Sequence, residues 1–276
     1  MPQEPMASSS PKPLTQFEQR EVDHDCPKHG MQRVKIIKLF SDWNQPSCPA
    51  CEREREQAKA DDEQRRRAHA DAERKRQRIE SMLKGSGIPP RFNDRSFDTF
   101  NPPNDAALKI LDVCRDYAVR FPEYQARGTG MIFCGNPGAG KSHMACAIAN
   151  HVITQHQKSA VFLKTAKAIR MVKETYGKAS EKTEQQALDW FKIPDLLILD
   201  EVGVQFGTDA ERYILFEIIN ERYEGLKPTI LLSNLNIEGL KEYAGDRVLD
   251  RMRENGGRVL GFTWGSYRAN VGKENA

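Results

Sequence analysis

The sequence predicts an α/β fold, in which helices cover both faces of a mostly parallel five-stranded sheet. From Ile88 onward, short apolar runs alternate with helical segments, which is the pattern of strand–helix–strand units, and a glycine-rich loop follows the first run. Parallel sheets are buried on both faces, so strands are expected at the apolar runs 131–134, 160–163, 196–199, 229–232 and 259–262. The helical segments between them are 141–156, 166–176, 183–190 and 210–223.

Length and composition exclude several classes of protein. The 276 residues suffice for one or two domains, and 38% of them are hydrophobic and 29% charged. No segment approaches the ~18 uninterrupted apolar residues of a membrane-spanning helix, and residues 1–14 lack the apolar stretch of a secretory signal. We therefore expect a cytoplasmic protein with no membrane partner. The 42 basic and 39 acidic residues leave a net charge of +3, so any nucleic-acid surface must be local.

Composition divides the chain into five parts. Residues 1–22 are rich in Pro, Ser and Gln and are expected to form a disordered tail, and 23–52 hold a cysteine cluster around a short apolar run. Residues 53–85 are mostly charged residues, Ala and Gln, which favours an exposed helical arm. Glycines and prolines at 85–90 break that helix. The α/β domain is expected at 86–265, followed by a short tail at 266–276.

Cys26, His29, Cys48 and Cys51 form a C-x₂-H pair and a C-x₂-C pair. The two-residue spacing lets each pair give two ligands to one ion, and four nitrogen and sulfur ligands favour a closed, structural Zn²⁺ site. The apolar run between the pairs would form the hairpin of a small zinc ribbon, because this segment has too few apolar residues to fold without metal. His24 is a poorer ligand, and scattered free thiols are the alternative interpretation.

The segment 135–142 reads GNPGAGKS and matches the phosphate-binding loop G-x-x-x-x-G-K-[ST], between a strand and a helix as the motif requires. Glycines let backbone N–H groups face phosphate oxygens, Lys141 would reach the β- and γ-phosphates of ATP, and the Ser142 hydroxyl would ligate Mg²⁺. The alternative is a plain glycine-rich turn. The residues expected to contact the nucleotide are Gly135, Asn136, Pro137, Gly138, Ala139, Gly140, Lys141, Ser142 and His143.

Two further strand ends carry groups suited to ATP hydrolysis. Asp200 and Glu201 follow the apolar run 196–199, at the edge where open α/β sheets bind ligands. Asp200 would complete the Mg²⁺ shell with Ser142, and Glu201 would polarise the attacking water. Asn234 follows the run 229–232 and would orient the water or sense the γ-phosphate. Taken alone, each of these side chains also fits an ordinary loop or turn position.

The segment 245–253 has helical spacing with Arg247 and Arg251 on one face. Asp and Arg at this spacing usually form a solvated, salt-bridged surface. An arginine here could instead reach the γ-phosphate bound by a neighbouring subunit, as an arginine finger acting in trans.

These motifs together resemble the DnaC-type replicative helicase loaders of the AAA+ class. The segments GNPGAGKSHMACAIANHV, DLLILDEVGVQ, TILLSNLN, GDRVLDRMR and GFTWGSYR occur in that order, and the resemblance covers roughly residues 86–273. The related IstB-like ATPases that help transposases share the same core.

The resemblance implies an AAA+ ATPase that binds single-stranded DNA and delivers a hexameric replicative helicase onto it, in a bacterial or phage-infected cell. It implies self-association in the ATP state, with Asn234 as sensor 1, Arg251 as the arginine finger and Arg247 as its near competitor. It also implies that no C-terminal lid domain follows the last strand. An IstB-like transposase helper is the alternative, and a zinc-stapled adaptor without hydrolysis is a third class.

A local DNA surface is predicted at Lys164, Lys167, Arg170 and Lys173, which recur at every third residue. A row of basic side chains can follow a phosphate backbone, although a solvated basic face has the same pattern. In the DnaC family the N-terminal region contacts the helicase, so the resemblance implies this role for the ribbon and the charged helix, although it does not cover the cysteine cluster in detail.

Overall fold

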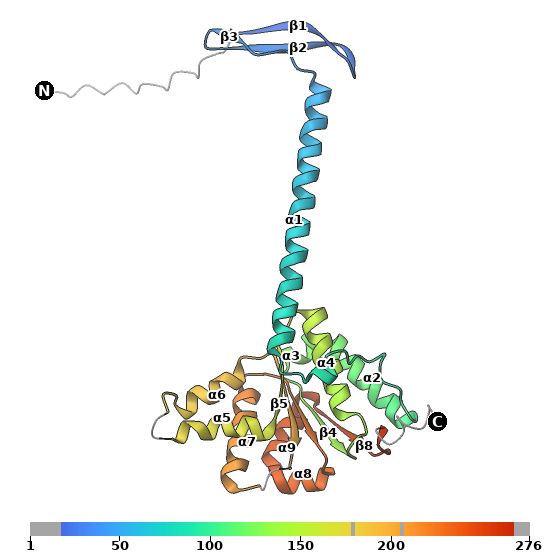
Figure 1. Cartoon of the computed structure of the whole chain (residues 1–276), viewed down its shortest axis with the longest axis vertical. Helices are drawn as coiled ribbons and strands as arrows, with labels where there is room; N and C mark the ends of the chain where they lie inside the picture. The colour runs from blue at the N-terminus through green and yellow to red at the C-terminus, as the bar shows by residue number, and fades with distance from the viewer. Residues whose placement is uncertain (1–17, 178–179, 205–206, 268–276) are drawn as a thin grey trace, which may run out of the picture. The chain divides into compact units, whose positions relative to one another are not determined.

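The computed structural model describes residues 18–177, 180–204 and 207–267. The chain divides into two compact units, Met1–Arg74 and Lys75–Ala276. The division falls inside helix α1 (Pro49–Gly85), so the last turns of this helix belong to the second unit (Figure 1). Most of the predicted N-terminal tail and nearly all of the predicted C-terminal tail lie outside the described residues.

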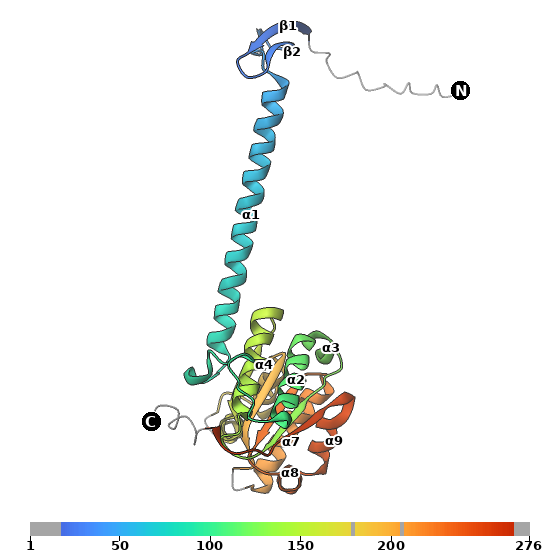
Figure 2. The same cartoon turned by 90° about the vertical axis from the view of Figure 1, so that its right-hand side faces the viewer.

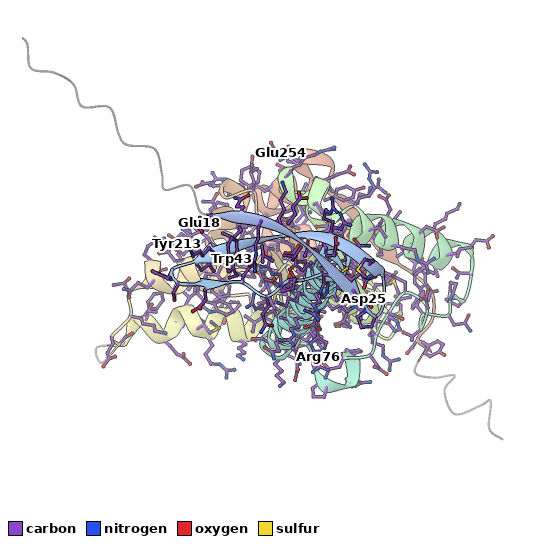
Figure 3. All side chains as sticks on the ribbon, turned by 90° about the horizontal axis from the view of Figure 1, so that it is seen from above. Glu18, Asp25, Trp43, Arg76, Tyr213 and Glu254 are labelled. Carbon is purple, nitrogen blue, oxygen red and sulfur yellow. The ribbon has the colours of Figure 1, made fainter. Side chains whose placement is uncertain are left out.

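The first unit contains an antiparallel hairpin of β1 (Gln19–Cys26) and β2 (Gly30–Leu39), to which the short β3 (Asp42–Trp43) adds. Figure 3 shows Glu18 and Trp43 toward one end of this hairpin and Asp25 at the other. The apolar core is small, because the buried hydrophobic residues here are Cys26, Val34, Ile36 and Cys48. The hairpin is therefore held mainly by strand pairing and by its cysteine cluster.

The hairpin begins earlier than the sequence predicts. Residues 1–22 were expected to be a disordered tail, but Gln19 already pairs with Ile37 of β2, so this expectation is wrong for 19–22. The side chains of β1 are mostly polar and exposed, and cross-strand backbone hydrogen bonds, which leave no hydrophobic pattern in the sequence, determine where the strand begins.

Helix α1 is 37 residues long and contains no fully buried residue, as expected for a charged arm. Ion pairs at i,i+4 spacing, such as Arg66–Asp62 and Lys84–Glu80, line its surface. The helix begins at Pro49, four residues before the predicted start, and it incorporates Cys51. The helix ends at Gly85 as predicted, but its last turns are not a fully exposed arm, because three partly buried apolar residues pack against the core of the second unit: Ile79, Met82 and Leu83.

The second unit is built on a parallel sheet, with strand order β5–β6–β7–β4–β8 in the described chain. The strands are β4 (Met131–Gly135), β5 (Ala160–Lys164), β6 (Leu196–Val202), β7 (Thr229–Ser233) and β8 (Arg258–Phe262). Each coincides with one of the predicted apolar runs to within a few residues. The prediction of an α/β P-loop fold with a five-stranded parallel sheet is confirmed.

Helices cover both faces of this sheet (Figures 1 and 2). One face packs against α2 (Asp105–Val119), α3 (Phe121–Ala126) and α4 (Lys141–His156). The other packs against α5 (Thr165–Lys173), α6 (Glu184–Lys192), α7 (Asp209–Glu224), α8 (Ile237–Ala244) and α9 (Asp246–Arg253). Successive strand residues alternate between the two cores: Met131 and Phe133 enter the first, and Ile132 and Cys134 enter the second.

Short one-turn 3₁₀ helices complete the described chain: η1 (Pro90–Phe92), η2 (Glu174–Tyr176) and η3 (Glu254–Gly256). The sequence analysis did not predict α2, α3 or α8. Side-chain caps mark two of their starts, since Asn104 accepts a hydrogen bond from the N–H of Ala107 and Asn236 accepts one from Gly239. No helix in the described ranges is long and apolar enough to span a membrane.

Candidate functional site

The loop between β4 and α4 has the backbone geometry of a phosphate cradle. Gly135, Gly138 and Gly140 have φ values of 115°, 78° and 100°, a region that favours glycine. Helix α4 begins at Lys141, so its N-terminal N–H groups and its dipole face the loop. This geometry is that expected of a phosphate-binding loop (P-loop) at 135–142, and a plain glycine-rich turn does not require it.

Lys141 lies inside this loop. Its side chain is buried, with a relative exposure of 6%, and its Nζ donates hydrogen bonds to the carbonyls of Gly135 (2.8 Å) and Asn136 (2.7 Å). A cationic ammonium held in the loop suits the β- and γ-phosphates of a nucleotide.

Ser142 and Asp200 come together from α4 and β6, with 3.3 Å between Ser142 Oγ and Asp200 Oδ2. The N–H of Glu201 donates to Asp200 Oδ1 (2.8 Å), and Thr165 Oγ1 donates to the Asp200 carbonyl (2.8 Å), so the carboxylate is fixed. Burial raises the pKa of Asp200 above its usual value. A cation beside this buried carboxylate would favour its charged form, and a hydroxyl and a carboxylate are oxygen ligands that fit Mg²⁺.

Glu201 has an unusual backbone conformation. Its φ is 60°, in the left-handed region, where the pairing between β6 and β7 shifts register between Leu199 and Val202. The Glu201 carboxylate is paired with Lys164 from the end of β5, at 2.9 Å. Lys164, predicted to contact DNA, thus forms an ion pair with the predicted general base.

A cleft of about 690 Å³ is lined by Asp200, Glu201, Asn234 and part of the P-loop, and its size suits a ligand as large as a nucleotide. The predicted nucleotide contacts in its lining are Pro137, Gly138, Gly140, Lys141, Ser142 and His143, whereas Gly135, Asn136 and Ala139 are not part of it. The opposite wall comes from the segment 87–101, which the sequence analysis did not assign to the site: Arg91, Phe92, Arg95, Thr99, Phe100 and Asn101. The family resemblance includes this segment but assigned no site role to it, because the placement of these residues depends on how the chain folds back before α2.

His143 connects the P-loop helix to this wall. Its Nε2 lies 2.9 Å from the Ser96 carbonyl oxygen and 3.2 Å from Thr99 Oγ1, and its ring packs edge-on against Phe100 at 5.4 Å. Burial lowers the pKa of His143, which favours the neutral ring. His143 was predicted to contact the nucleotide; it lines the cleft and also holds the wall in place.

The two arginines of α9 differ in their surroundings. Arg251 lies against the rings of Phe216 (4.5 Å) and Tyr223 (5.4 Å) on α7, and its Nη1 is buried with no hydrogen-bond partner in the described chain. Arg247, one turn earlier, has an exposed side chain. Cation–π contacts stabilise Arg251 within its own subunit.

The predicted basic row does not form a single face. Each three-residue step on an α-helix falls about 60° short of a full turn, so the row winds around α5. Lys173 turns toward α7 and pairs with Glu211 at 3.0 Å, whereas Lys167 and Arg170 are exposed. Ile169 and Val172 of α5 are buried, whereas Tyr176 in η2 is 53% exposed.

In the first unit, Cys26, His29, Cys48 and Cys51 bring their ligand atoms within 4.8 Å of one another. The Cys26 and Cys51 sulfurs are 3.5 Å apart, and His29 Nδ1 lies 3.3 to 3.7 Å from the three sulfurs. Tetrahedral Zn–S bonds of about 2.3 Å place sulfurs about 3.8 Å apart, so this donor set fits one Zn²⁺ ion. His24 is outside the cluster among the described residues.

Groups around the cluster shift the pKa values of its thiols in opposite directions, and a carboxylate contacts its histidine. Backbone N–H groups of Lys28 and His29 lower the pKa of the Cys26 thiol to about 6, and the neighbouring Cys26 sulfur raises the pKa of Cys51 to about 11. Glu54 Oε1 lies 3.3 Å from His29 Nε2, as in carboxylate–histidine–metal triads, and also pairs with Lys28. The sequence analysis missed Glu54, which lies one helical turn after Cys51.

Comparison with known proteins agrees with this architecture. The IstB-like ATP binding protein family matches residues 43–268. The replicative helicase loader DnaC of Buchnera aphidicola subsp. Acyrthosiphon pisum is 36% identical over 194 residues, covering 70% of this chain and 77% of the relative. DnaC of Escherichia coli K12 is 33% identical over 198 residues, with coverages of 71% and 79%. The uncharacterized protein YdaV of the same strain is 31% identical over 252 residues, covering 89% of this chain and 91% of YdaV.

Two solved structures share the fold. The crystal structure of the DnaC helicase loader superposes with a TM-score of 0.56 at 24% identity, covering 63% of this chain and 99% of the other. The crystal structure of DnaI superposes with a TM-score of 0.53 at 19% identity, covering 65% and 93%. The chain belongs to the IstB-like ATP-binding family and, within it, is a DnaC-type AAA+ protein.

Proposed function

We propose that this protein is an ATP-dependent loader that binds a hexameric replicative helicase and delivers it onto single-stranded DNA. The observation that carries the proposal is the 36% identity to a replicative helicase loader over 77% of its length. The groups gathered at the carboxyl edge of the sheet support ATP hydrolysis as its chemistry. ATP binding would assemble the complex, and hydrolysis would release it.

In the proposed ATPase, Lys141 binds the β- and γ-phosphates, and Ser142 and Asp200 hold Mg²⁺. The ion, when bound, neutralises charge on the phosphate oxygens. Glu201 orients and polarises the attacking water as general base, and Asn234 faces the same cleft as sensor.

Self-association through an arginine finger is part of the proposal. A finger needs an exposed side chain that can reach a neighbouring subunit. The aromatic contacts of Arg251 oppose that role, so we assign the finger to Arg247, in place of the Arg251 that the resemblance favours.

For DNA contact we retain the exposed Lys167 and Arg170 of α5 as the leading pair. Lys164 and Lys173 are each held in an ion pair with a carboxylate. Lys167 also lines the nucleotide cleft, so Arg170 gives the clearer test of DNA binding.

We assign helicase binding to the first unit, and the turn between β2 and β3 supports this assignment. Phe40 is fully exposed at φ 58°, with Leu39 beside it 51% exposed. A left-handed conformation costs a bulky residue on the order of 1 kcal/mol, and exposing its ring to water adds to that cost. Both costs would be offset if the ring were buried in the helicase.

The alternative, an IstB-like helper of a transposase, is less favoured, because the DnaC relatives are named as helicase loaders. A zinc-stapled adaptor without hydrolysis does not account for the arrangement of Lys141, Ser142, Asp200 and Glu201.

Mixing the protein with a hexameric DnaB-type helicase, with and without ATP, and measuring complex mass tests the proposal. We expect an ATP-dependent complex, weakened at least tenfold by Phe40→Ser. The control Met31→Ser changes a different exposed apolar residue, which lies in β2 and is 68% exposed. This variant should bind the helicase as the parent does. A parent that forms no complex with the helicase, or one with a transposase instead, would overturn the loader function.

A further inference from the structure

The chain after β8 is bonded to the P-loop. We call Thr263–Tyr267 the C-terminal brace. The indole Nε1–H of Trp264 donates to the Ala139 carbonyl at 2.9 Å, and the backbone N–H of Tyr267 donates to the Gly138 carbonyl at 3.0 Å. The brace therefore contacts the same loop that lines the nucleotide cleft: Tyr267 lines the cleft beside Gly138, whereas Trp264 and Ala139 lie outside the cleft lining.

The loop also donates to the brace. The side-chain amide of Asn136 donates to the carbonyls of Thr263 (2.8 Å) and Trp264 (3.0 Å). Contact is close on this side, because a Cβ on Gly138 would lie 2.1 Å from the Ser266 hydroxyl. The glycine at 138 is thus required by the brace as well as by its φ of 78°.

These bonds determine where the loop's N–H groups point. In a planar trans peptide the C=O and the following N–H point in opposite directions, and the described chain contains no cis peptide bond. When Trp264 holds the Ala139 carbonyl outward, the N–H of Gly140 must point inward, toward the cleft that Gly140 and Lys141 line. A fixed inward N–H is the donor that a phosphate oxygen requires.

From this geometry we infer that Trp264 is a positioning residue for nucleotide binding, and that the C-terminal brace holds the P-loop in its phosphate-binding conformation. The inference rests on the proposed nucleotide site. The loop and the brace also form one bonded unit, so a nucleotide in the loop changes the surroundings of the Trp264 indole.

Tryptophan suits this position. The ring is 8% exposed and packs against Phe262, with centroids 5.1 Å apart, while the N–H reaches the loop. Phenylalanine would keep an aromatic ring in this space but would have no N–H to orient the Ala139 carbonyl.

The first test compares Mg·ATP binding to Trp264→Phe and to the parent by isothermal titration calorimetry, well below either melting temperature. We expect the dissociation constant to rise roughly two- to tenfold, as for the loss of one hydrogen bond. The matched control is Trp190→Phe, which makes the same change on α6, where the indole packs on Phe191. It should bind Mg·ATP as the parent does.

The second test leaves Trp264 intact and does not depend on how well Trp264→Phe folds. Replacing the other two tryptophans, Trp43→Phe and Trp190→Phe, makes Trp264 the sole indole. Its emission should change when Mg·ATP is added and stay constant when Lys141→Ala is introduced into the same background. A residue that only fills the core would not report the nucleotide in this way.

An unchanged dissociation constant in Trp264→Phe, or Trp264 emission indifferent to Mg·ATP in a protein that binds it, would overturn the inference. A parent that binds no nucleotide would instead overturn the proposed ATPase, so the two failures are distinguishable.

Discussion

At the carboxyl edge of the sheet, the backbone conformation of each residue determines which groups its side chain contacts. The local sequence Leu-Asp-Glu ends a buried strand, yet the register shift and the left-handed φ of Glu201 direct two adjacent carboxylates differently. Asp200 faces Ser142 in a buried setting, and Glu201 faces Lys164 at the surface of the cleft. One carboxylate is thereby suited to a metal ion and the other to water.

The different surroundings of the two arginines of α9 predict different effects of their replacement. Arg247→Ala should lower ATP hydrolysis about a thousandfold, the effect of losing an arginine finger, while nucleotide affinity stays near that of the parent. Arg251→Ala should chiefly lower the melting temperature, because it removes the contacts with Phe216 and Tyr223. Steady-state phosphate release and thermal unfolding measure both; an inactive Arg251→Ala of parental stability would reverse the assignment.

The sequence could predict the site residues that lie in one continuous motif or at the carboxyl ends of parallel strands. The P-loop is one continuous segment, and two strand ends reach the same edge by topology, so Lys141, Ser142, Asp200 and Asn234 were predictable. The rings over Arg251 and the partner of Lys164 depend on packing between distant segments, which no local pattern encodes.

Among the elements, the hairpin β1–β2 and the start of α1 are those that the proposed zinc ion would stabilise most. Three cysteines and a histidine come together where the hydrophobic core is very small. Cys48 and Cys51 lie at the N-terminus of α1, so the helix begins at the cysteine cluster.

Glu54 provides a test of the metal centre. The parent should hold one zinc ion per chain, and Glu54→Gln should lower zinc affinity roughly 10- to 100-fold, because the carboxylate orients His29. Glu56→Gln, on the same helix and exposed, is the matched control and should bind zinc normally. Competition with a chromogenic chelator measures all three; a purified parent without zinc affinity would contradict the site.

Helix α5 carries the prediction about DNA. Arg170→Glu should weaken binding of a fluorescent single-stranded oligonucleotide several-fold, more at low than at high salt, because the contact is with phosphates. Mg·ATP affinity should stay unchanged. Arg127→Glu makes the same charge change after α3 and serves as control. Equal DNA affinity in both variants would remove α5 from the DNA surface.

Elements were predictable where continuous apolar runs mark buried strands and helix-favouring segments lie between or after them, which covers the five strands of the sheet, α4 to α7 and α9. Other positions depend on long-range contacts. Arg222, fully buried on α7, donates to the carbonyls of Phe191, Pro194 and Pro228 and so joins the ends of α6 and α7. Burial lowers its pKa, and a sequence pattern gives no reason to expect an arginine inside the core.

For the whole molecule, the division inside α1 separates the unit that we propose binds the helicase from the unit that contains the proposed nucleotide site. Ile79, Met82 and Leu83 tie the last turns of α1 to the core of the second unit. A truncated protein meant to retain the ATPase should therefore lack residues 1–74 and begin at Lys75. Removing the whole helix would expose the apolar surface that its last turns cover. The sequence predicts a domain boundary at 85 because glycines and prolines break the helix there. The packing of the last turns of α1 against the second unit leaves no such mark in the composition.

The central claim is that Mg·ATP binds between the Lys141 loop and Asp200. Calorimetric titration of the full chain with Mg·ATP, beside Lys141→Ala, tests it most directly. We predict one site per chain in the parent and a dissociation constant about 10- to 100-fold higher in the variant, because a charged hydrogen-bond donor to the phosphates is lost. A parent that binds no ATP, or a Lys141→Ala variant that binds it equally well, would contradict the account.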